Sequence, residues 1–423
     1  MDDTLIDRLS ALSSRKRALL EARLRNRQGR THAPASEAAV LKKEEGVGAS
    51  HDATVARAPK RLHRPITFSC FFFSDDGATQ RADKYNLLIK CARFADRNGF
   101  EAVWTPERHF KPFGGLYPNP SVLSGALAMI TERIAIRAGS VVLPLHDPLR
   151  AAEEWSVVDN LSGGRTGIAI ASGWHPDDFA LVPESYERRR ELAFEHIQML
   201  RRLWNGETVE RRNGVGATVA LRIYPNPIQA QLPLWLTAMS ERSFVEAGRI
   251  GAHVLTGLMD QDVGECARRI SLYRRARTEH GFDPDAGRVA LMVHTYIGNR
   301  LDEVRALVRE PMIEYLRSFL AASEDQLRAR TDVGAVMRSS DEDDFHALLD
   351  HAFGRYFETR SLMGTQESCG RMVRVLSAIG VDELACLLDF GLDHATVLDG
   401  LDDLNELRRA TQESVEPGGH PVM

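Results

Sequence analysis

Long apolar segments are absent from this chain of 423 residues. No run of about 18 apolar residues occurs, so we expect no transmembrane helix and no membrane partner. The first residues are acidic and then basic, without the apolar core of a secretory signal peptide. The five cysteines are scattered, and none has the spacing of a metal site. These features predict a cytoplasmic globular protein with buried, reduced thiols.

Several motifs of catalysis are missing as well. No Gly-x-Gly-x-x-Gly follows the first predicted strand, which disfavours a doubly wound dinucleotide-binding sheet and leaves no NAD(P)H fingerprint. No Gly-x-Ser-x-Gly occurs, and no cysteine at a predicted strand end has an evident histidine partner. The sequence therefore argues against a serine or cysteine nucleophile.

Charge is distributed unevenly along the chain. Residues 1–64 contain fourteen Lys and Arg against eight Asp and Glu, a balance of +6, and the whole chain carries −5, so the remainder carries −11. The positive residues lie in a short helical pattern without interleaved aromatic residues for base stacking. We therefore expect no nucleic-acid partner.

The chain divides into four parts. Residues 1–28 have leucines near helical spacing, which predicts an amphipathic N-terminal helical segment. Residues 29–63 are rich in Ala, Gly, Ser, Pro and charge, which predicts a flexible linker. Residues 64–415 alternate strand and helix patterns, and residues 416–423 are expected to form a disordered tail.

Eight apolar strand patterns within residues 64–415 are separated by helical patterns. Eight β–α pairs predict an α/β fold of the (β/α)8 TIM-barrel type rather than an open sheet. The stretch 322–380 is too long for one connection and predicts a helical insertion over one end of the barrel. A last helix is predicted at 395–411. The predicted strands are 66–73, 102–105, 134–143, 165–171, 233–238, 252–256, 289–297 and 383–390.

A polar loop follows the second predicted strand, which Pro106 ends. The loop places Glu107, Arg108 and His109 before the next helix. Because α/β barrels carry their chemistry on such strand-to-helix loops, these three residues are the candidate catalytic residues.

A metal site at the barrel mouth is an alternative use of the histidines. His109, His146 and His175 could meet there, as in zinc-binding barrels. The carboxylates expected beside them are not placed as a set, so we expect no metal.

The other predicted strand ends carry small, aromatic and hydroxyl-bearing residues, which suit a flat, anionic, aromatic cofactor. Ser240 is a candidate N-cap at a helix start, where free amides would hold a phosphate, although simple capping explains it equally. Trp174 could stack on the cofactor ring or only plug the mouth, and Tyr186 with the arginines after it could reach the phosphate or form a solvated face. The candidate cofactor-binding residues are Phe72, Gly139, Ser140, Ala171, Ser172, Gly173, Trp174, Tyr186, Ala238, Met239, Ser240, Thr256, Gly257 and Leu258.

Four segments taken together carry a family resemblance. They are Trp104–Phe110 continuing to Asn119-Pro120, Gly139–Pro144 with Asp147–Arg150, Asp159–Arg165 followed by Ala171–Trp174, and Thr237–Ser240 followed by Thr256–Leu258. They resemble the bacterial luciferase-like flavin monooxygenases. Cys386–Gly391 resembles, more narrowly, the subgroup found in polyketide and nonribosomal peptide gene clusters.

The resemblance implies reduced FMN across the barrel mouth, supplied by a separate flavin reductase, with O2 as co-substrate. Oxygen would add to the flavin to give a hydroperoxide, which would oxygenate a substrate by hydroxylation, oxygen insertion or N-oxygenation. Phe71, Phe72, Trp104 and Trp174 would form the dry lining that such a species requires. Gly139-Ser140 falls where luciferases often have a cis peptide bond.

The resemblance also implies partners. The substrate is expected to be an acyl or aminoacyl group on a carrier protein of an assembly line, and the barrel is expected to form a homodimer. The segment Leu12–Leu24 resembles the docking helices of assembly-line synthases, although packing on the barrel or on a dimer mate explains it equally.

One position departs from the family pattern. Luciferases have two adjacent histidines, and the first, which is thought to act in catalysis, is replaced by Arg108 here. Arginine cannot serve as a general base near neutral pH, so the resemblance does not imply light emission. Arg108 could stabilise an anionic peroxide or contact the substrate, while His109 or Glu107 handles protons.

Three functions stay open on the sequence alone. The first is the FMN-dependent monooxygenase. The second is a deazaflavin-dependent oxidoreductase on the same barrel, and the third is a non-catalytic flavin-binding subunit.

Overall fold

The computed structural model describes residues 65–74, 84–328 and 342–413. The predicted N-terminal helical segment at 1–28, the linker at 29–63 and the tail at 416–423 lie outside these residues. All five cysteines are buried and free, as the sequence predicts. Among the described helices, none is both long and apolar enough to cross a membrane.

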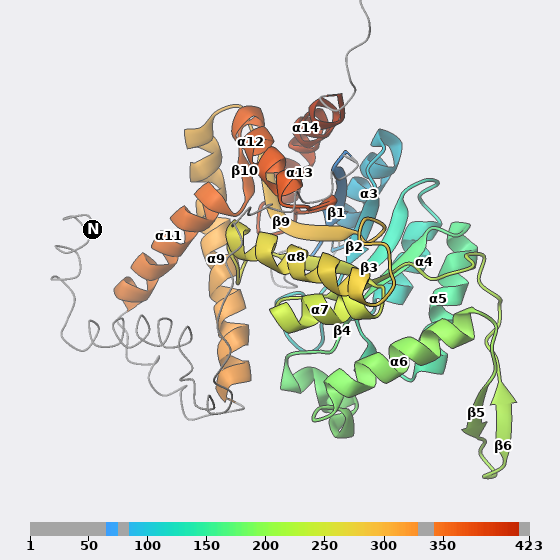
Figure 1. Ribbon diagram of the computed structural model, residues 1–423. Coiled ribbons are helices and arrows are strands. Elements are labelled where there is room, and N and C mark those ends of the chain that lie inside the picture. Colours follow the sequence, from blue (N-terminus) through green and yellow to red (C-terminus); the bar gives the residue numbers. More distant parts are fainter. Residues whose placement is uncertain (1–64, 75–83, 329–341, 414–423) are drawn as a thin grey trace, which may run out of the picture. The chain divides into compact units, whose positions relative to one another are not determined.

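Eight parallel strands close into a barrel, which confirms the predicted TIM-type fold (Figure 1). Neighbouring strands pair in the order β11, β1, β2, β3, β4, β7, β8, β9, and the pairing of β9 with β11 completes the ring. All eight predicted strands are present. Their bounds are β1 Thr67–Phe71, β2 Ala102–Thr105, β3 Ala135–Val142, β4 Thr166–Ala171, β7 Leu234–Thr237, β8 His253–Gly257, β9 Val289–Ile297 and β11 Glu383–Leu387.

Helices connect successive strands and cover the barrel. Several begin at capping residues that the sequence makes recognisable, because Ser, Thr, Asp and Asn side chains accept hydrogen bonds from first-turn amides. Asn119, Asp147, Ser240 and Asp262 act in this way. The helices are α3 Asn86–Asn98, α4 Pro120–Ala128, α5 Pro148–Ser162, α6 Arg189–Trp204, α7 Glu241–Arg249 and α8 Val263–Glu279.

The connection from β9 to β11 spans the stretch 322–380, for which the helical insertion stays a prediction. Its helices are α9 Leu301–Arg328, α11 Glu342–Thr359 and α12 Gln366–Ala378. The sequence prediction missed β10, Leu362–Gly364, which pairs in parallel with β9. It also missed the antiparallel hairpin of β5 Val209–Arg212 and β6 Thr218–Leu221. The predicted last helix is two helices, α13 His394–Asp399 and α14 Leu401–Glu413.

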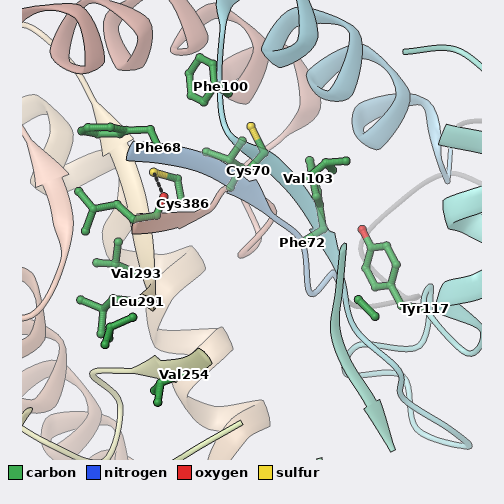
Figure 2. Packing of buried hydrophobic residues seen from close by; sticks show 14 of the residues in the cluster. Phe68, Cys70, Phe72, Phe100, Val103, Tyr117, Val254, Leu291, Val293 and Cys386 are labelled. Carbon is green, nitrogen blue, oxygen red and sulfur yellow. Dashed lines mark hydrogen bonds between the residues drawn. The ribbon is translucent and has the colours of Figure 1, made fainter. Parts of the chain in front are cut away.

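The barrel has an outer core under the helices and an inner core around its axis. Phe68, Cys70 and Phe72 of β1 and its continuation belong to the outer core (Figure 2). Phe71 belongs to the inner core, where Trp104 and Trp235 pack edge to face at 5.2 Å between ring centroids. Side chains alternate along a strand, so neighbours in this apolar run face opposite sides of the barrel wall.

A buried ionic network closes the amino-terminal end of the barrel. The Glu383 carboxylate, at the start of β11, accepts hydrogen bonds from Ser69 Oγ at 2.6 Å, Trp104 Nε1 at 2.9 Å and Arg137 Nη1 at 2.7 Å. Arg288 Nη2 lies 3.8 Å from the same carboxylate. Burial raises the pKa of Glu383, but Arg137 and Arg288 outweigh this effect and hold the pKa below its usual value. This network fills the end of the barrel opposite the carboxyl-terminal ends of the strands.

Candidate active site

Glu107 lies at the carboxyl-terminal face of the barrel, two residues after β2 ends. Its carboxylate accepts a hydrogen bond from the backbone N–H of Val142 at 2.6 Å. Its Oε1 lies 2.9 Å from His109 Nε2 and 2.6 Å from His146 Nε2. Burial raises the pKa of Glu107, but the bonds to His109 and His146 outweigh it and hold the pKa below its usual value. Glu107 is therefore an ionised anchor.

The Glu107 carboxylate determines which histidine nitrogens carry protons. An ionised carboxylate only accepts hydrogen bonds, so the Nε2 atoms of His109 and His146 both act as donors. In the neutral rings, Nδ1 is then the nitrogen that can take up a proton. Burial lowers the pKa of His146, but the bond to Glu107 and its charge outweigh this and raise the pKa above its usual value. Glu107 thus orients two histidines, His109 on its own loop and His146 after β3.

Arg108 is buried and engaged with the loop after β4. Its side chain is 1% exposed, and Nη1 donates to Asp178 Oδ2 at 2.8 Å. The guanidinium carbon lies 4.8 Å from the centroid of the Trp174 ring. Asp178 lies in the 3-10 helix Pro176–Leu181. The arginine that replaces the first family histidine is therefore clamped between a carboxylate and an indole.

The alternative of a metal site gains no support from the histidine positions. His109 and His146 share the Glu107 oxygen, whereas His175 packs edge to face on Trp174 at 5.5 Å between ring centroids. Within the described part of the chain, no group of three or more His, Cys, Asp or Glu side chains is placed to hold a metal ion.

A polar cavity of about 350 Å³ opens between the ends of β4 and β7 and the helices α6 and α7. It brings together Ala171, Ser172, Gly173, Trp174, Met239 and Ser240 from the predicted cofactor site. Its other lining residues stand outside the set of candidate cofactor-binding residues, although the sequence suggests Arg242, Ser243 and one of the arginines after Tyr186 as phosphate contacts. These other lining residues are Arg189, Arg190, Ala193, Phe194, Leu236, Thr237, Arg242, Ser243 and Glu246.

The start of α7 gives this cavity an anion-accepting wall. Ser240 and Ser243 form a reciprocal capping box, in which Ser243 N donates to Ser240 Oγ at 3.3 Å and Ser240 N donates to Ser243 Oγ at 3.0 Å. The amides of Glu241 and Arg242 in the first turn have no intrahelical partner. A helix amino terminus attracts negative charge, and arginines line the same cavity. The residues present therefore fit a phosphate.

The Gly139-Ser140 peptide bond is cis, at the position where luciferases often have such a bond. A side chain at Gly139 would place Cβ 2.7 Å from the Phe71 ring, so only glycine fits. Ser140 Oγ lies 2.7 Å from Thr237 Oγ1, and Thr237 lines the cavity. The cis peptide and the phosphate-accepting cavity are therefore joined by one hydrogen bond.

Other predicted cofactor-binding residues do not line this cavity. Phe72 is fully buried in the outer core, which argues against its direct contact with a cofactor. Ala238, Thr256, Gly257 and Leu258 are buried at the ends of β7 and β8, where Gln261 donates to Thr256 Oγ1 at 2.9 Å. Their part in cofactor binding stays a prediction.

Tyr186 is a supporting residue in this structure. Its ring lies 4.2 Å from the Arg189 guanidinium carbon, and its backbone carbonyl accepts from Arg189 Nη1 at 2.6 Å. Tyr186 thereby positions an arginine that lines the cavity.

A second polar group at the mouth escaped sequence analysis. His294, near the end of β9, is fully buried, and its Nδ1 lies 2.7 Å from the Tyr356 hydroxyl of α11. Burial lowers the pKa of His294 to about 3, so the ring is neutral. Tyr315 and Phe390 pack edge to face on it. The only sequence signal is the position of His294 within a strand, which is typical of core residues as well.

An anion-accepting cavity at the carboxyl-terminal face is typical of (β/α)8 enzymes that hold a phosphorylated cofactor on their strand-to-helix loops. The sequence profile described as "Luciferase-like monooxygenase" matches residues 66–383. The chain belongs to this family. Its relatives include the oxygenase component of a flavin-dependent monooxygenase.

Individual relatives are distant and differ in how much of the chain they match. The chain is 25% identical over 361 residues to the oxygenase component of a flavin-dependent trigonelline monooxygenase of Acinetobacter baylyi, covering 82% of this chain and 96% of that protein. It is 26% identical over 197 residues to the alkanal monooxygenase alpha chain of Photorhabdus luminescens, covering 46% of this chain and 54% of the relative.

Solved structures share the fold. The oxygenating constituent of 3,6-diketocamphane monooxygenase from Pseudomonas putida, solved with FMN, superposes with a TM-score of 0.66 at 18% identity, covering 82% of this chain and 98% of that chain. An F420-dependent secondary alcohol dehydrogenase superposes with a TM-score of 0.61 at 17% identity, covering 82% and 99%. At these identities the likeness concerns the fold alone.

Proposed function

We propose that the protein is an FMN- and O2-dependent monooxygenase whose flavin phosphate lies in the cavity between β4 and β7. The observation that carries the proposal is this cavity, which combines the amino terminus of α7 with Arg189, Arg190 and Arg242. A phosphate dianion would bind by charge-assisted hydrogen bonds there. Thr237 and the Gly139-Ser140 segment bonded to it would then help to hold the isoalloxazine.

The side chains of the mouth have defined tasks in this proposal. Reduced flavin, when bound, supplies the activation of O2. The Nδ1 atoms of His109 and His146 take up or release a proton, because Glu107 keeps both Nε2 atoms as donors. Trp174, which lines the cavity, would exclude water from the reacting atoms.

The partners follow from the same proposal. The Acinetobacter baylyi relative is described as an oxygenase component, which supports a separate flavin reductase as the source of reduced FMN. We propose an acyl or aminoacyl group on a carrier protein of natural-product biosynthesis as substrate, a cytoplasmic location, and a homodimer. Docking of the carrier protein by residues 1–28 is part of the proposal.

A deazaflavin-dependent oxidoreductase is the second candidate. The fold likeness to an F420-dependent dehydrogenase favours it, because the same cavity accepts the phosphate of either cofactor. The non-catalytic flavin-binding subunit is the third possibility, and product formation by the isolated chain excludes it.

The decisive experiment mixes anaerobic protein, loaded with reduced FMN or with reduced deazaflavin, with oxygenated buffer. For the proposed monooxygenase we expect a transient absorbance change before the spectrum of oxidised FMN returns. With reduced deazaflavin we expect a spectrum that oxygen does not change. Immediate return of oxidised FMN without such a transient would contradict the proposal.

The substrate class is tested by intact mass spectrometry of acyl-carrier proteins after incubation with the protein, a flavin reductase, FMN and O2. A gain of one oxygen atom is expected. Deletion of residues 1–60 should lower this activity if the segment docks the carrier, and unchanged activity excludes docking.

A further inference from the structure

Arg108 presents an unused hydrogen-bonding edge inside the protein. Nη1 is bonded to Asp178, but Nε and Nη2 have no partner among the described residues. The side chain is 1% exposed, so solvent does not satisfy these donors. Buried donors in folded proteins are almost always paired, and an exception calls for a ligand or an ordered water.

His175, which packs on Trp174 as Arg108 does, has a further buried donor without a partner among the described residues. The backbone N–H of Asp177 donates to His175 Nδ1 at 3.2 Å, which places the ring proton on Nε2. Burial, and then the charge of Arg108, lowers the pKa of His175, so the ring is neutral. Nε2 is fully buried and has no partner within the described part of the chain. His175 and Arg108 both pack on Trp174.

The geometry of the unused edge indicates which ligand it would take. The Nε–H and one Nη2–H of a guanidinium point in parallel and match the two oxygens of a carboxylate. A neutral carbonyl would occupy only one of the two donors. The clamp by Asp178 and Trp174 fixes the guanidinium plane, so the edge is organised before a ligand arrives.

The position of this edge relates it to the proposed reaction. Arg108 directly follows Glu107, which orients His109 and His146. Trp174, on which Arg108 packs, lines the cavity assigned to the flavin phosphate. A carboxylate bound to Arg108 would therefore lie close to Trp174 and so to the wall of this cavity.

We infer that Arg108 binds a carboxylate of the substrate through its Nε–Nη2 edge, with His175 Nε2 as an accessory donor, so that the substrate is an organic acid. The identification of the ligand as a substrate rests on the proposed function. Binding of a carboxylate to Arg108 can be tested without turnover. A carrier-bound substrate would then bear its carboxylate on the part of the acyl chain distant from the thioester.

The test is calorimetric titration of the full-length protein with benzoate and with benzamide, its neutral isostere. We expect saturable binding of benzoate and at least about tenfold weaker binding of benzamide, because the latter offers one acceptor and no charge. Equal affinity for the two ligands overturns the inference, and this comparison requires no variant.

Three variants locate the site. Arg108→Gln should weaken benzoate binding about tenfold or more, and Arg108→Lys should fall between it and the unaltered protein because it keeps the charge but not the fork. Arg408→Gln, which changes another buried arginine bonded to Asn405 and Gln412, should bind benzoate like the unaltered protein. Benzoate binding unaffected by either Arg108 change, or a crystal soaked in benzoate with only water on the edge, overturns the inference.

Anaerobic titration with reduced FMN separates this inference from the proposed function. Binding of FMN without any carboxylate binding defeats only the Arg108 assignment. Carboxylate binding without FMN binding defeats the proposed function and leaves the acid site standing.

Discussion

The barrel contains two buried clusters of charge that differ in how completely their polar atoms are paired. The basal cluster, Glu101, Arg137, Arg288 and Glu383, lies at the amino-terminal end of the strands. The mouth cluster, Glu107, Arg108, His175 and Asp178, lies at the opposite end. In the basal cluster no buried side-chain nitrogen or oxygen lacks a partner among the described residues, whereas Arg108, His175 and Asp178 all have such atoms.

The difference separates a structural role from a binding role. Leaving a buried polar atom unpaired costs free energy, so a cluster that only stabilises the fold is expected to be saturated. An unsaturated cluster pays this cost in the free protein and recovers it when a ligand binds. The comparison therefore assigns the basal cluster to stability and the mouth cluster to ligand recognition.

The largest effect is expected at the basal cluster. Glu383→Ala removes the buried carboxylate that lies 2.7 Å from Arg137 Nη1 and leaves Arg137 with only the partly exposed Glu101 as an ionic partner. It should lower the free energy of unfolding by about 3–5 kcal/mol. Urea unfolding followed by circular dichroism measures this loss. Glu101→Ala, which removes a partly exposed partner of the same arginine, is the control and should cost less. If the two variants lost equal free energy of unfolding, the buried Glu383 would contribute no more to stability than the partly exposed Glu101.

A substitution in the histidine pair at the barrel mouth should lower activity and leave stability unchanged. His109→Ala removes an oriented proton carrier, so turnover of the substrate found by the carrier-protein screen should fall about a hundredfold. FMN affinity and the urea midpoint should stay as in the unaltered protein. His280→Ala, at the end of α8, is the control with unchanged turnover. Full turnover by His109→Ala would remove His109 from the proposed chemistry.

The effect of the Glu107 carboxylate should be measurable as a change in the pKa of His146. Pairing raises the pKa of His146 in the folded state, so the stabilisation it gives is complete below the unfolded pKa and is lost as the pH rises through the folded pKa. Glu107→Gln removes the charge and should lower the pKa of His146, measured by NMR of the imidazole C–H signals. An unchanged pKa would show that Glu107 does not control this histidine.

The smallest effect concerns two matched capping boxes. Ser240→Ala at α7 and Thr365→Ala at α12 should each lower stability by about 1 kcal/mol, because each removes an acceptor for a first-turn amide. Only Ser240 lines the cavity. We therefore expect a loss of FMN affinity for Ser240→Ala alone, and an equal loss for Thr365→Ala would show that the effect is not local.

The sequence predicts where many residues of the two clusters lie. It does not predict which residues they contact. Strand-helix alternation predicts all eight barrel strands, and Pro106 places Glu107, Arg108 and His109 at the mouth. The partners come from distant segments. Arg108 meets Asp178 70 residues later, and Arg137 meets Glu383 246 residues later. No local pattern encodes such pairs.

The prediction for Phe72 illustrates a second limit. A strand apolar on both faces shows no alternation between polar and apolar residues, so its sequence does not reveal which side chains face the barrel axis. The structure places Phe71 inside and Phe72 outside. The arginines of α6 were visible as a charge run, but only the packing of α6 beside β4 and β7 shows that two of them line the cavity.

The central claim, that the cavity between β4 and β7 holds the flavin phosphate, is tested most directly by comparing reduced FMN with reduced riboflavin in anaerobic titrations. Because the two ligands differ only by the phosphate, we expect FMN to bind about a hundredfold more tightly, and Arg190→Ala to narrow that ratio. Equal affinities for FMN and riboflavin would contradict the account.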